Sequence, residues 1–312
     1  MTDVIYPHNQ QLYDRRFMNC AERHAIVFLK ERREEVDWLL YRSLVSSDEI
    51  FRQILQEKKP KYNFNNGCFS VEDFALLGVR VNELRSNDYH SIKKDVDGLI
   101  EKQGFVLISG SVFYFDHCPE FRKKHLHHLV VLCGVSEPGN RYDVVDDNPA
   151  SVLCSYQYNS SKVADFYENN GVRVVRFFTL EAFDKVLARE AFEQRFKTYI
   201  KHFSDEQRYY HDIASFLENP FETFDNKLNL LHDGFSLLSG SRNLFAHFLG
   251  AFNTNVESIS LAQQIAKDAF VLKSLVVKAR IMQRMDVHDI TSRVEKMRLK
   301  EEQLLHALKG NL

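Results

Sequence analysis

One cysteine and one histidine of this chain have the surroundings that thiol catalysis needs. Cys20 stands where residues 21–29 begin an apolar stripe of helical spacing, and a helix N-terminus favours the thiolate form. His128 is the first position of a strongly apolar strand, and the next strand ends in Asp146 and Asp147. An imidazole that deprotonates a thiol, with an acid that fixes its tautomer, is what cysteine hydrolases and acyltransferases use.

The sequence leaves two alternatives for the acid. The two strands are predicted to form a hairpin in which Val135 pairs with Arg141. In that register His128 and Asp146 are diagonal neighbours on one face of the sheet, roughly 7–8 Å apart before their side chains reach. A slip of one residue would instead bring Asp147 opposite His128. We expect Asp146 to be the acid and keep Asp147 as the alternative.

The elements that must position these residues change character along the chain. Helices are predicted near residues 20–29, 47–61 and 69–77. Strands are predicted at residues 105–108, 112–115, 129–133, 142–145 and 172–178. Beyond Thr179 the helical period dominates, in blocks 180–203, 206–217, 224–238, 242–252, 259–285 and 290–308. We therefore predict an α+β domain with an antiparallel sheet over residues 1–175, followed by an α-helical domain over residues 176–312.

Composition and charge argue against several classes of protein. The formal net charge of −2 disfavours a nucleic acid or an anionic membrane as the main partner. No run of residues approaches the ~20 apolar positions that a membrane span needs, and the N-terminus lacks the features of a signal peptide. The five cysteines are odd in number and include no C-x-x-C pair, which suits free thiols in a reducing compartment. We expect a cytoplasmic protein.

The same residues carry a resemblance to a known family. Similar segments are residues 104–108 (GFVLI), 113–115 (FYF), 127–135 (HHLVVLCGV) and 142–146 (YDVVD). They look like the N-terminal catalytic domain of the butirosin-biosynthesis-H type, and the Asn19-Cys20 pair resembles its nucleophile segment. Residues 238–249 (LSGSRNLFAHFL) resemble a signature of the helical domain that often follows. The resemblance spans most of the chain.

The resemblance implies a papain-like fold for the first domain and a specific reaction. Members of this family move acyl or aminoacyl groups from a carrier-protein thioester to an amine in specialised-metabolite assembly, and relatives in thioamide-peptide pathways are similar to amide synthetases. The implied partners are an acyl or peptidyl carrier protein, with its phosphopantetheine arm, and a small amine. Neither ATP nor a bound cofactor is needed. Peptidases of this fold have an Asp directly before Pro, whereas this chain has Asp146-Asp147-Asn148-Pro149, so the acid stays open.

Five further residues are candidates for binding. Asn19 and Gln11 are candidate donors to an oxyanion. Tyr114 and Asp116, at the end of an aromatic run, are candidates for contact with the amine. Arg242, at a predicted helix start, could hold the phosphate of phosphopantetheine, although ordinary helix capping explains the same residues.

Histidines gather close before the strand that begins at His128. With Cys118 they raise the possibility of a zinc site: His117, His125 and His127. No further ligand pair with zinc spacing accompanies them, so we interpret them as polar capping and expect no metal. His24, one helical turn after Cys20, is interpreted as a surface or supporting residue.

The leading hypothesis is amide-forming acyl transfer by Cys20, His128 and Asp146. The same triad would hydrolyse amides or thioesters if water reached the acyl-enzyme. A second alternative is a binding protein on a degenerate peptidase fold. Residues 293–309 have an amphipathic pattern that would dock on the body of the protein or on a second copy in a homodimer.

Overall fold

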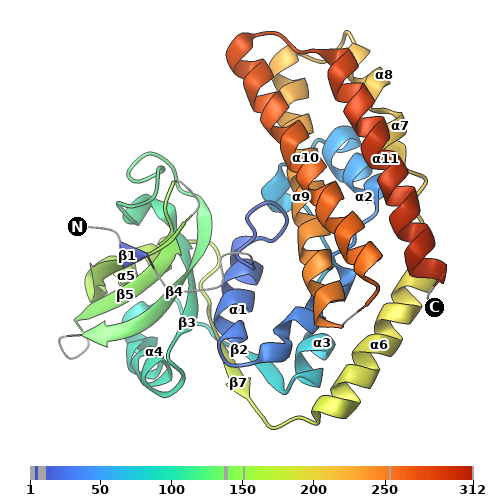
Figure 1. The fold of residues 1–312 in the computed structure, drawn as a ribbon. Coiled ribbons are helices and arrows are strands. Elements are labelled where there is room, and N and C mark those ends of the chain that lie inside the picture. The colour runs from blue at the N-terminus through green and yellow to red at the C-terminus, as the bar shows by residue number, and fades with distance from the viewer. Residues whose placement is uncertain (1–3, 6–11, 137–139, 150–151, 253, 311–312) are drawn as a thin grey trace. The chain divides into compact units, whose positions relative to one another are not determined.

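The chain forms two compact units, which interleave along the sequence. The computed structural model describes residues 4–5, 12–136, 140–149, 152–252 and 254–310 (Figure 1). One unit takes in the described residues up to Arg15, together with Asn19–Arg33 and Phe74–Phe183. The other takes in Arg16–Met18, Glu34–Asp73 and the chain from Asp184 onward. The sequence predicted one boundary near residue 175. The structure divides the chain differently, because residues 34–73 belong with the C-terminal helices.

An antiparallel sheet organises the first unit. In the described part of the chain its strand order is β1-β6-β5-β4-β3-β7-β2, with antiparallel pairing throughout. The strands are β1 (Val4–Ile5), β2 (Val79–Leu84), β3 (Val106–Ser111), β4 (His127–Ser136), β5 (Arg141–Asp147), β6 (Leu153–Asn159) and β7 (Val175–Leu180). The predicted α+β class is confirmed. The patterns of β2 and β6 were not recognised in the sequence, and the strand predicted at residues 112–115 is instead the 3-10 turn η4 (Val112–Tyr114).

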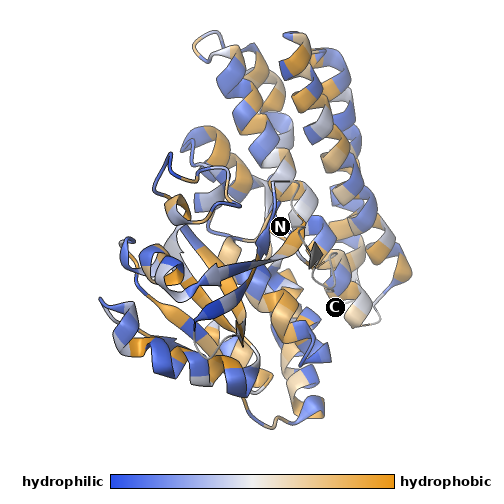
Figure 2. Cartoon of the chain, turned by 90° about the vertical axis from the view of Figure 1, so that its left-hand side faces the viewer, coloured by the Kyte–Doolittle hydropathy of each residue, from blue (hydrophilic) through white to orange (hydrophobic). Residues whose placement is uncertain are grey.

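Helices cover this sheet and close its core. They are α1 (Cys20–Lys30), α4 (Tyr89–Gln103) and α5 (Ser160–Glu168). Tyr89, Ile92, Val96 and Ile100 recur at helical spacing along α4 and share one buried cluster with residues of β3, β4 and α5. Figure 2, coloured by hydropathy, shows that the helices of this unit carry both apolar and polar residues along their length. α1 packs against β4, which brings the start of α1 to the strand that begins at His127.

The β4–β5 hairpin contains a β-bulge that the sequence did not reveal. At the turn end Val135 pairs with Tyr142, so the predicted pairing of Val135 with Arg141 is wrong by one residue. The register then shifts between Leu132 and Gly134, and Leu132 pairs with Val144. A bulge adds one residue to one strand and bends it locally. Beyond the bulge the register is therefore the one that places Asp146 on the same face as His128.

The regular elements of the second unit are helices wherever the structure describes it. Its elements are η1 (Glu34–Arg42), α2 (Ser47–Ile50), η2 (Phe51–Gln56), η3 (Lys61–Asn63), the start of α3 (Val71–Leu76), α6 (Lys185–His202), α7 (Arg208–His211), α8 (Ile213–Glu218), α9 (Phe224–Ala251), α10 (Val256–Met282) and α11 (Val287–Gly310). The predicted C-terminal helical region is confirmed. Two of the predicted blocks, 224–238 and 242–252, are one continuous helix, α9, which begins at the Thr223 cap.

Arg242 has a structural environment that differs from the prediction. It lies inside α9, fully buried, and its Nε donates to Glu301 Oε1 at 2.8 Å. Its Nη1 donates to the backbone oxygen of Val45 at 2.6 Å, and Tyr210 donates its hydroxyl to the same Glu301 oxygen at 2.9 Å. No helix begins at this point of the described chain, so the predicted phosphate site at Arg242 is wrong.

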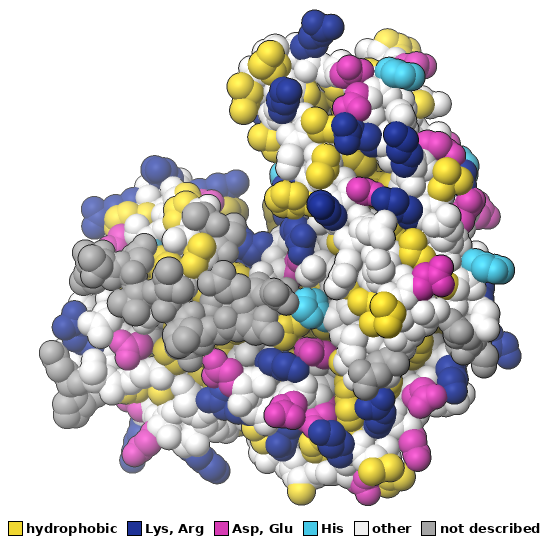
Figure 3. All heavy atoms as spheres, in the orientation of Figure 1, with side chains coloured by type: hydrophobic (Ala, Val, Ile, Leu, Met, Phe, Trp, Pro, Cys, Tyr) yellow, Lys and Arg dark blue, Asp and Glu magenta, His cyan; other side chains and the backbone are white. Residues whose placement is uncertain are grey.

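The face of the second unit seen in Figure 3 carries charges of both signs together with exposed hydrophobic side chains. Figure 3 shows Lys and Arg side chains interspersed with Asp and Glu side chains over the helices of the second unit. Among the described helices, none combines the length and the apolar content that a bilayer crossing requires.

The buried pair of Arg242 and Glu301 yields a stability prediction. We expect Arg242→Met to lower the free energy of unfolding by about 3–5 kcal/mol, because Glu301 is left as a buried charge without its cation. Urea denaturation followed by fluorescence measures it, since Trp38, the chain's single tryptophan, packs against Phe192 and Phe252 in the same unit.

A matched control separates burial from the loss of an arginine. Arg293 pairs with Asp289 on the surface of α11, and Arg293→Met is expected to cost under about 1 kcal/mol. Adding Glu301→Leu to Arg242→Met should restore most of the lost stability, because it removes the uncompensated charge. If Arg242→Met and Arg293→Met lowered the free energy of unfolding equally, the proposed contribution of the buried pair to stability would be contradicted.

Candidate active site

Cys20 occupies the first position of helix α1. Asn19 caps the helix: its side-chain oxygen accepts from the backbone N–H of Glu22 at 3.0 Å, and Glu22 accepts from the Asn19 N–H at 3.0 Å. Such a capping box fixes where a helix begins. The Cys20 thiol is therefore at the positive end of the helix dipole, which stabilises a thiolate.

The structure brings Cys20, His128 and Asp146 together. His128 Nε2 lies 2.9 Å from Asp146 Oδ2 and 3.0 Å from Oδ1. This leaves Nδ1 as the ring nitrogen available to the thiol, and Cys20 and His128 share a hydrogen bond. A thiol, an imidazole and a carboxylate in this order have the connectivity of a nucleophile, base and orienting acid.

The three groups shift one another's proton affinity. Burial raises the pKa of the Cys20 thiol, but the hydrogen bond and charge of His128, aided by Arg23, outweigh it, and the net pKa lies below its ordinary value. Burial lowers the pKa of His128, but the charge and hydrogen bond of Asp146 outweigh it and raise that pKa to about 10. The pKa of Asp146 is held well below its usual range, because His128 and the neighbouring histidines outweigh its burial. The lowered pKa of Cys20 and the raised pKa of His128 both favour a thiolate beside an imidazolium.

Asp147 faces a different set of partners. Arg15 Nη1 lies 2.6 Å from Asp147 Oδ2, and Arg23 Nη2 lies 3.2 Å from Asp147 Oδ1. The Tyr13 hydroxyl donates to Asp147 Oδ1 at 3.1 Å. Arginine keeps its charge at all relevant pH values, so the partners of Asp147 are fixed cations. Of the two predicted acids, the structure brings Asp146 to His128.

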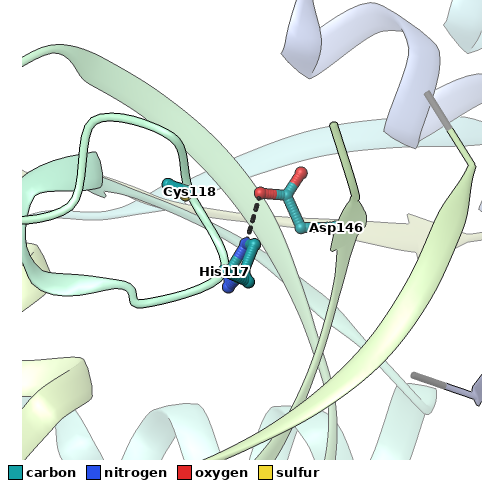
Figure 4. A group of neighbouring side chains, drawn as sticks. All are labelled: His117, Cys118 and Asp146. Atoms are coloured by element: carbon teal, nitrogen blue, oxygen red, sulfur yellow. Dashed lines mark hydrogen bonds and ion pairs between the residues drawn. The ribbon is translucent and has the colours of Figure 1, made fainter. Parts of the chain in front are cut away.

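Two further histidines lie beside Asp146. His117 Nε2 lies 3.0 Å from Asp146 Oδ2 (Figure 4), and His24 Nε2 lies 3.5 Å from Asp146 Oδ1. His24 was predicted to be a surface or a supporting residue; it is fully buried, so the surface alternative is wrong. His117 belongs to the loop before β4, whose path follows no periodic pattern. Its closeness to Cys118 and His125 in sequence was a signal, but one that suggested a metal.

Two groups of side chains have atoms close enough to share a metal ion. His117, Cys118 and Asp146 have potential ligand atoms within 4.8 Å of one another, and Figure 4 shows Asp146 facing the loop that carries the other two. The second group is His24, Asp146 and Asp147. Both groups depend on Asp146, so a metal ion at either would compete with His128 for that carboxylate.

The other predicted residues lie in varied places. Asp116 is exposed and pairs with Lys162 at 2.9 Å. Tyr114 belongs to η4, with its ring edge-on to Phe113. Asn19 uses its side-chain oxygen to cap α1. Gln11 lies outside the described residues.

Comparison with known proteins returned one relative of nearly full length. The chain is 22% identical over 306 residues to the ribostamycin:4-(gamma-L-glutamylamino)-(S)-2-hydroxybutanoyl-(BtrI acyl-carrier protein) 4-(gamma-L-glutamylamino)-(S)-2-hydroxybutanoate transferase of Niallia circulans. The match covers 96% of this chain and 97% of that enzyme. It confirms the predicted resemblance to the butirosin-biosynthesis-H type. No protein-family model matches the chain. The relative's activity, as its name states, is the transfer of an acyl group from a carrier protein.

The charge state of the pair predicts selective alkylation of Cys20. The Cys20 thiolate is present above its lowered pKa, and the His128 imidazolium is present below about 10. We expect iodoacetamide to label Cys20 at about pH 6 at least roughly tenfold faster than an ordinary thiol, and His128→Asn to remove this advantage. Mass mapping of the labelled cysteines across pH measures both effects.

Other cysteines in the same molecule serve as internal controls. Burial raises the pKa of Cys133 to about 12, and burial also raises the pKa of Cys118, so both should stay unlabelled at that pH. Labelling of Cys20 at the rate of Cys133, or at a rate that His128→Asn leaves unchanged, would disprove the ion pair.

Proposed function

We propose that this chain is a cysteine-dependent acyltransferase with a papain-like first unit, which forms an amide from a carrier-protein thioester and an amine. The observation that carries the proposal is the chain of contacts from Cys20 through His128 to Asp146. The carrier-protein substrate of the Niallia circulans relative supports a phosphopantetheine thioester as the acyl donor. No cofactor enters the proposed reaction.

The first half-reaction transfers the acyl group to the enzyme. The Cys20 thiolate attacks the thioester carbonyl, and the tetrahedral intermediate expels the pantetheine sulfur. His128 gives its Nδ1 proton to that sulfur, so the carrier leaves as a thiol and the imidazole becomes neutral. One thioester replaces another, and the energy of the acyl group is kept on Cys20.

The second half-reaction forms the amide. The neutral imidazole of His128 takes a proton from the amine as its nitrogen attacks the acyl-enzyme, and the intermediate expels the Cys20 thiolate. The products are an amide and the original thiolate–imidazolium pair, so no ATP is consumed. Asp146 stabilises the imidazolium in both steps and holds the ring in place.

Neighbouring groups complete the proposed site. The backbone N–H of Cys20, at the start of α1, is a suitable donor to the oxyanion, with Asn19 and Gln11 as further candidate donors. Asp116 already pairs with an ammonium group, that of Lys162. In the proposal an incoming amine replaces that group, and Tyr114 is a further candidate for contact with the amine.

Intact mass spectrometry tests the covalent intermediate. With an acyl-phosphopantetheine carrier and no amine, wild type should gain the mass of one acyl group, and Cys20→Ala should gain none, because the thioester forms on Sγ. Cys133→Ala, which removes another partly accessible free thiol, is the matched control and should react as wild type does.

Adding an amine then distinguishes the possible outcomes. Loss of the acyl mass with formation of amide supports transfer. Release of the free acid only, with or without the amine, would make the protein a hydrolase. No acyl mass on Cys20 with any thioester would leave a binding role and overturn the proposed reaction.

Neutralising either aspartate separates their roles. We expect Asp146→Asn to lower kcat by about 10²-fold or more, because His128 loses the anion that stabilises its charged form. Asp147→Asn should change kcat less than about tenfold and act chiefly on stability, since it leaves Arg15 and Arg23 without their carboxylate. Steady-state kinetics and thermal melting measure the two effects. The reverse ranking of the two kcat values would move the catalytic role to Asp147.

A further inference from the structure

Asp146 receives more donors than a catalytic triad needs. His128 donates to the carboxylate, His117 lies 3.0 Å from Oδ2, and the backbone N–H of Asp147 donates to Oδ1 at 2.8 Å. The Asp146 side chain is only 1% exposed, so water does not compensate its charge. The second histidine, His117, therefore contacts the carboxylate directly, and its role has to be explained separately from that of His128.

His117 is fixed from its other side as well. Its Nδ1 lies 2.7 Å from the hydroxyl of Tyr158, and its ring stacks on Tyr156 with centroids 4.0 Å apart and planes at 12°. Its side chain is 4% exposed. A carboxylate only accepts hydrogen bonds, so Nε2 must carry the hydrogen that faces Asp146. The hydroxyl of Tyr158 can donate to Nδ1 or accept from it, and it holds the ring from that side.

We infer that His117 is a positioning residue for the proposed acyl transfer, which holds Asp146 oriented toward His128, and that Tyr158 holds the ring of His117 in place through the hydrogen bond at Nδ1. This inference rests on the proposed function. With a hydrogen on Nε2, His117 donates to the carboxylate; without it, a lone pair of Nε2 would face the carboxylate and repel it. The Tyr158 hydroxyl can donate or accept, so its role is to fix where the ring lies.

His117 and His128 both contact Oδ2 of Asp146, and this explains why His128 alone would not keep the carboxylate oriented. His128 changes its charge in each half-reaction, and its bond to Asp146 weakens when the ring becomes neutral. A buried carboxylate that lost its main donor would turn toward other donors, and His24 stands 3.5 Å away. His117 touches neither substrate nor thiol in the proposed reaction, so its bond to Oδ2 persists through the cycle. It keeps Asp146 in place for the return of the proton to His128.

Several charged or titratable groups face this arrangement and enter its pH dependence. Those around Asp146 and His117 come from α1, β4, β5 and the loop before β4: Arg23, His24, His128, Asp147 and Cys118. Beyond Tyr158 lie Asp116 and Lys162. In the described part of the chain, the side chains that lie within 3.0 Å of Asp146 Oδ2 as hydrogen-bond partners are those of His128 and His117.

Three substitutions test the role of the donor. His117→Leu removes both nitrogens, His117→Gln keeps an N–H donor toward Asp146, and Tyr158→Phe removes only the hydroxyl that holds the ring of His117. We expect His117→Leu to lower kcat at least about tenfold, the size typical for a lost hydrogen bond to a charged group, with KM unchanged. His117→Gln should recover most of that loss, and Tyr158→Phe should fall between them.

The pH profile of Cys20 alkylation gives a readout that a merely structural role would not move. A misplaced Asp146 stabilises the imidazolium less, so the thiolate also forms less readily. The labelling profile of His117→Leu and Tyr158→Phe should therefore shift to higher pH. Tyr156→Phe, which keeps the ring that stacks on His117, should keep the wild-type profile.

The outcomes separate this inference from the proposed function. If wild type forms no amide, the proposed function fails, while the alkylation profiles still report on His117. If wild type is active and His117→Leu matches it in kcat and labelling profile, the positioning role is overturned. Equal losses in His117→Leu and His117→Gln, with Tyr158→Phe silent, would also overturn it, because packing rather than a donor would then matter.

Discussion

The buried charge of Asp146 is the constraint on which the first unit depends. Taking a carboxylate out of water costs several kcal/mol unless cations and donors replace the lost hydration. Here the replacements come from separate elements: His24 from α1, His117 from a loop and His128 from β4. Side chains from three parts of this unit therefore meet at one buried carboxylate.

Two adjacent aspartates acquire different chemistry from their neighbours alone. Asp147 is held by Arg15 and Arg23, whose charge does not change in the working pH range. Asp146 is held by histidines, and an imidazole can gain or lose a proton during a reaction. This contrast is why the structure favours Asp146 as the acid that acts on His128.

The sequence predicted those elements whose formation depends on neighbouring residues in the chain. The helix start at Cys20 follows from its cap and apolar stripe, and the strand at His128 follows from an apolar run. His117 could not be placed, because an irregular loop brings it to Asp146. Residues 239–241 suggested a break, yet small side chains buried inside α9 continue the helix. Arg242 then finds its partner in Glu301, which is distant in sequence and beyond any local pattern.

The bulge at Cys133 decides which aspartate reaches His128. At the turn end of the hairpin, Ser136 pairs with Arg141 and Gly134 with Asp143. Continued without interruption, that register would set Val131 against Asp146, on the face opposite to His128. The extra residue shifts the pairing by one, so that Val131 meets Val145, and Asp146 turns to the face of His128. A Cβ on Gly134 would lie 2.3 Å from Asp143 Oδ2, so a larger residue beside the bulge would have to displace the side chain of Asp143, the residue that pairs with position 134.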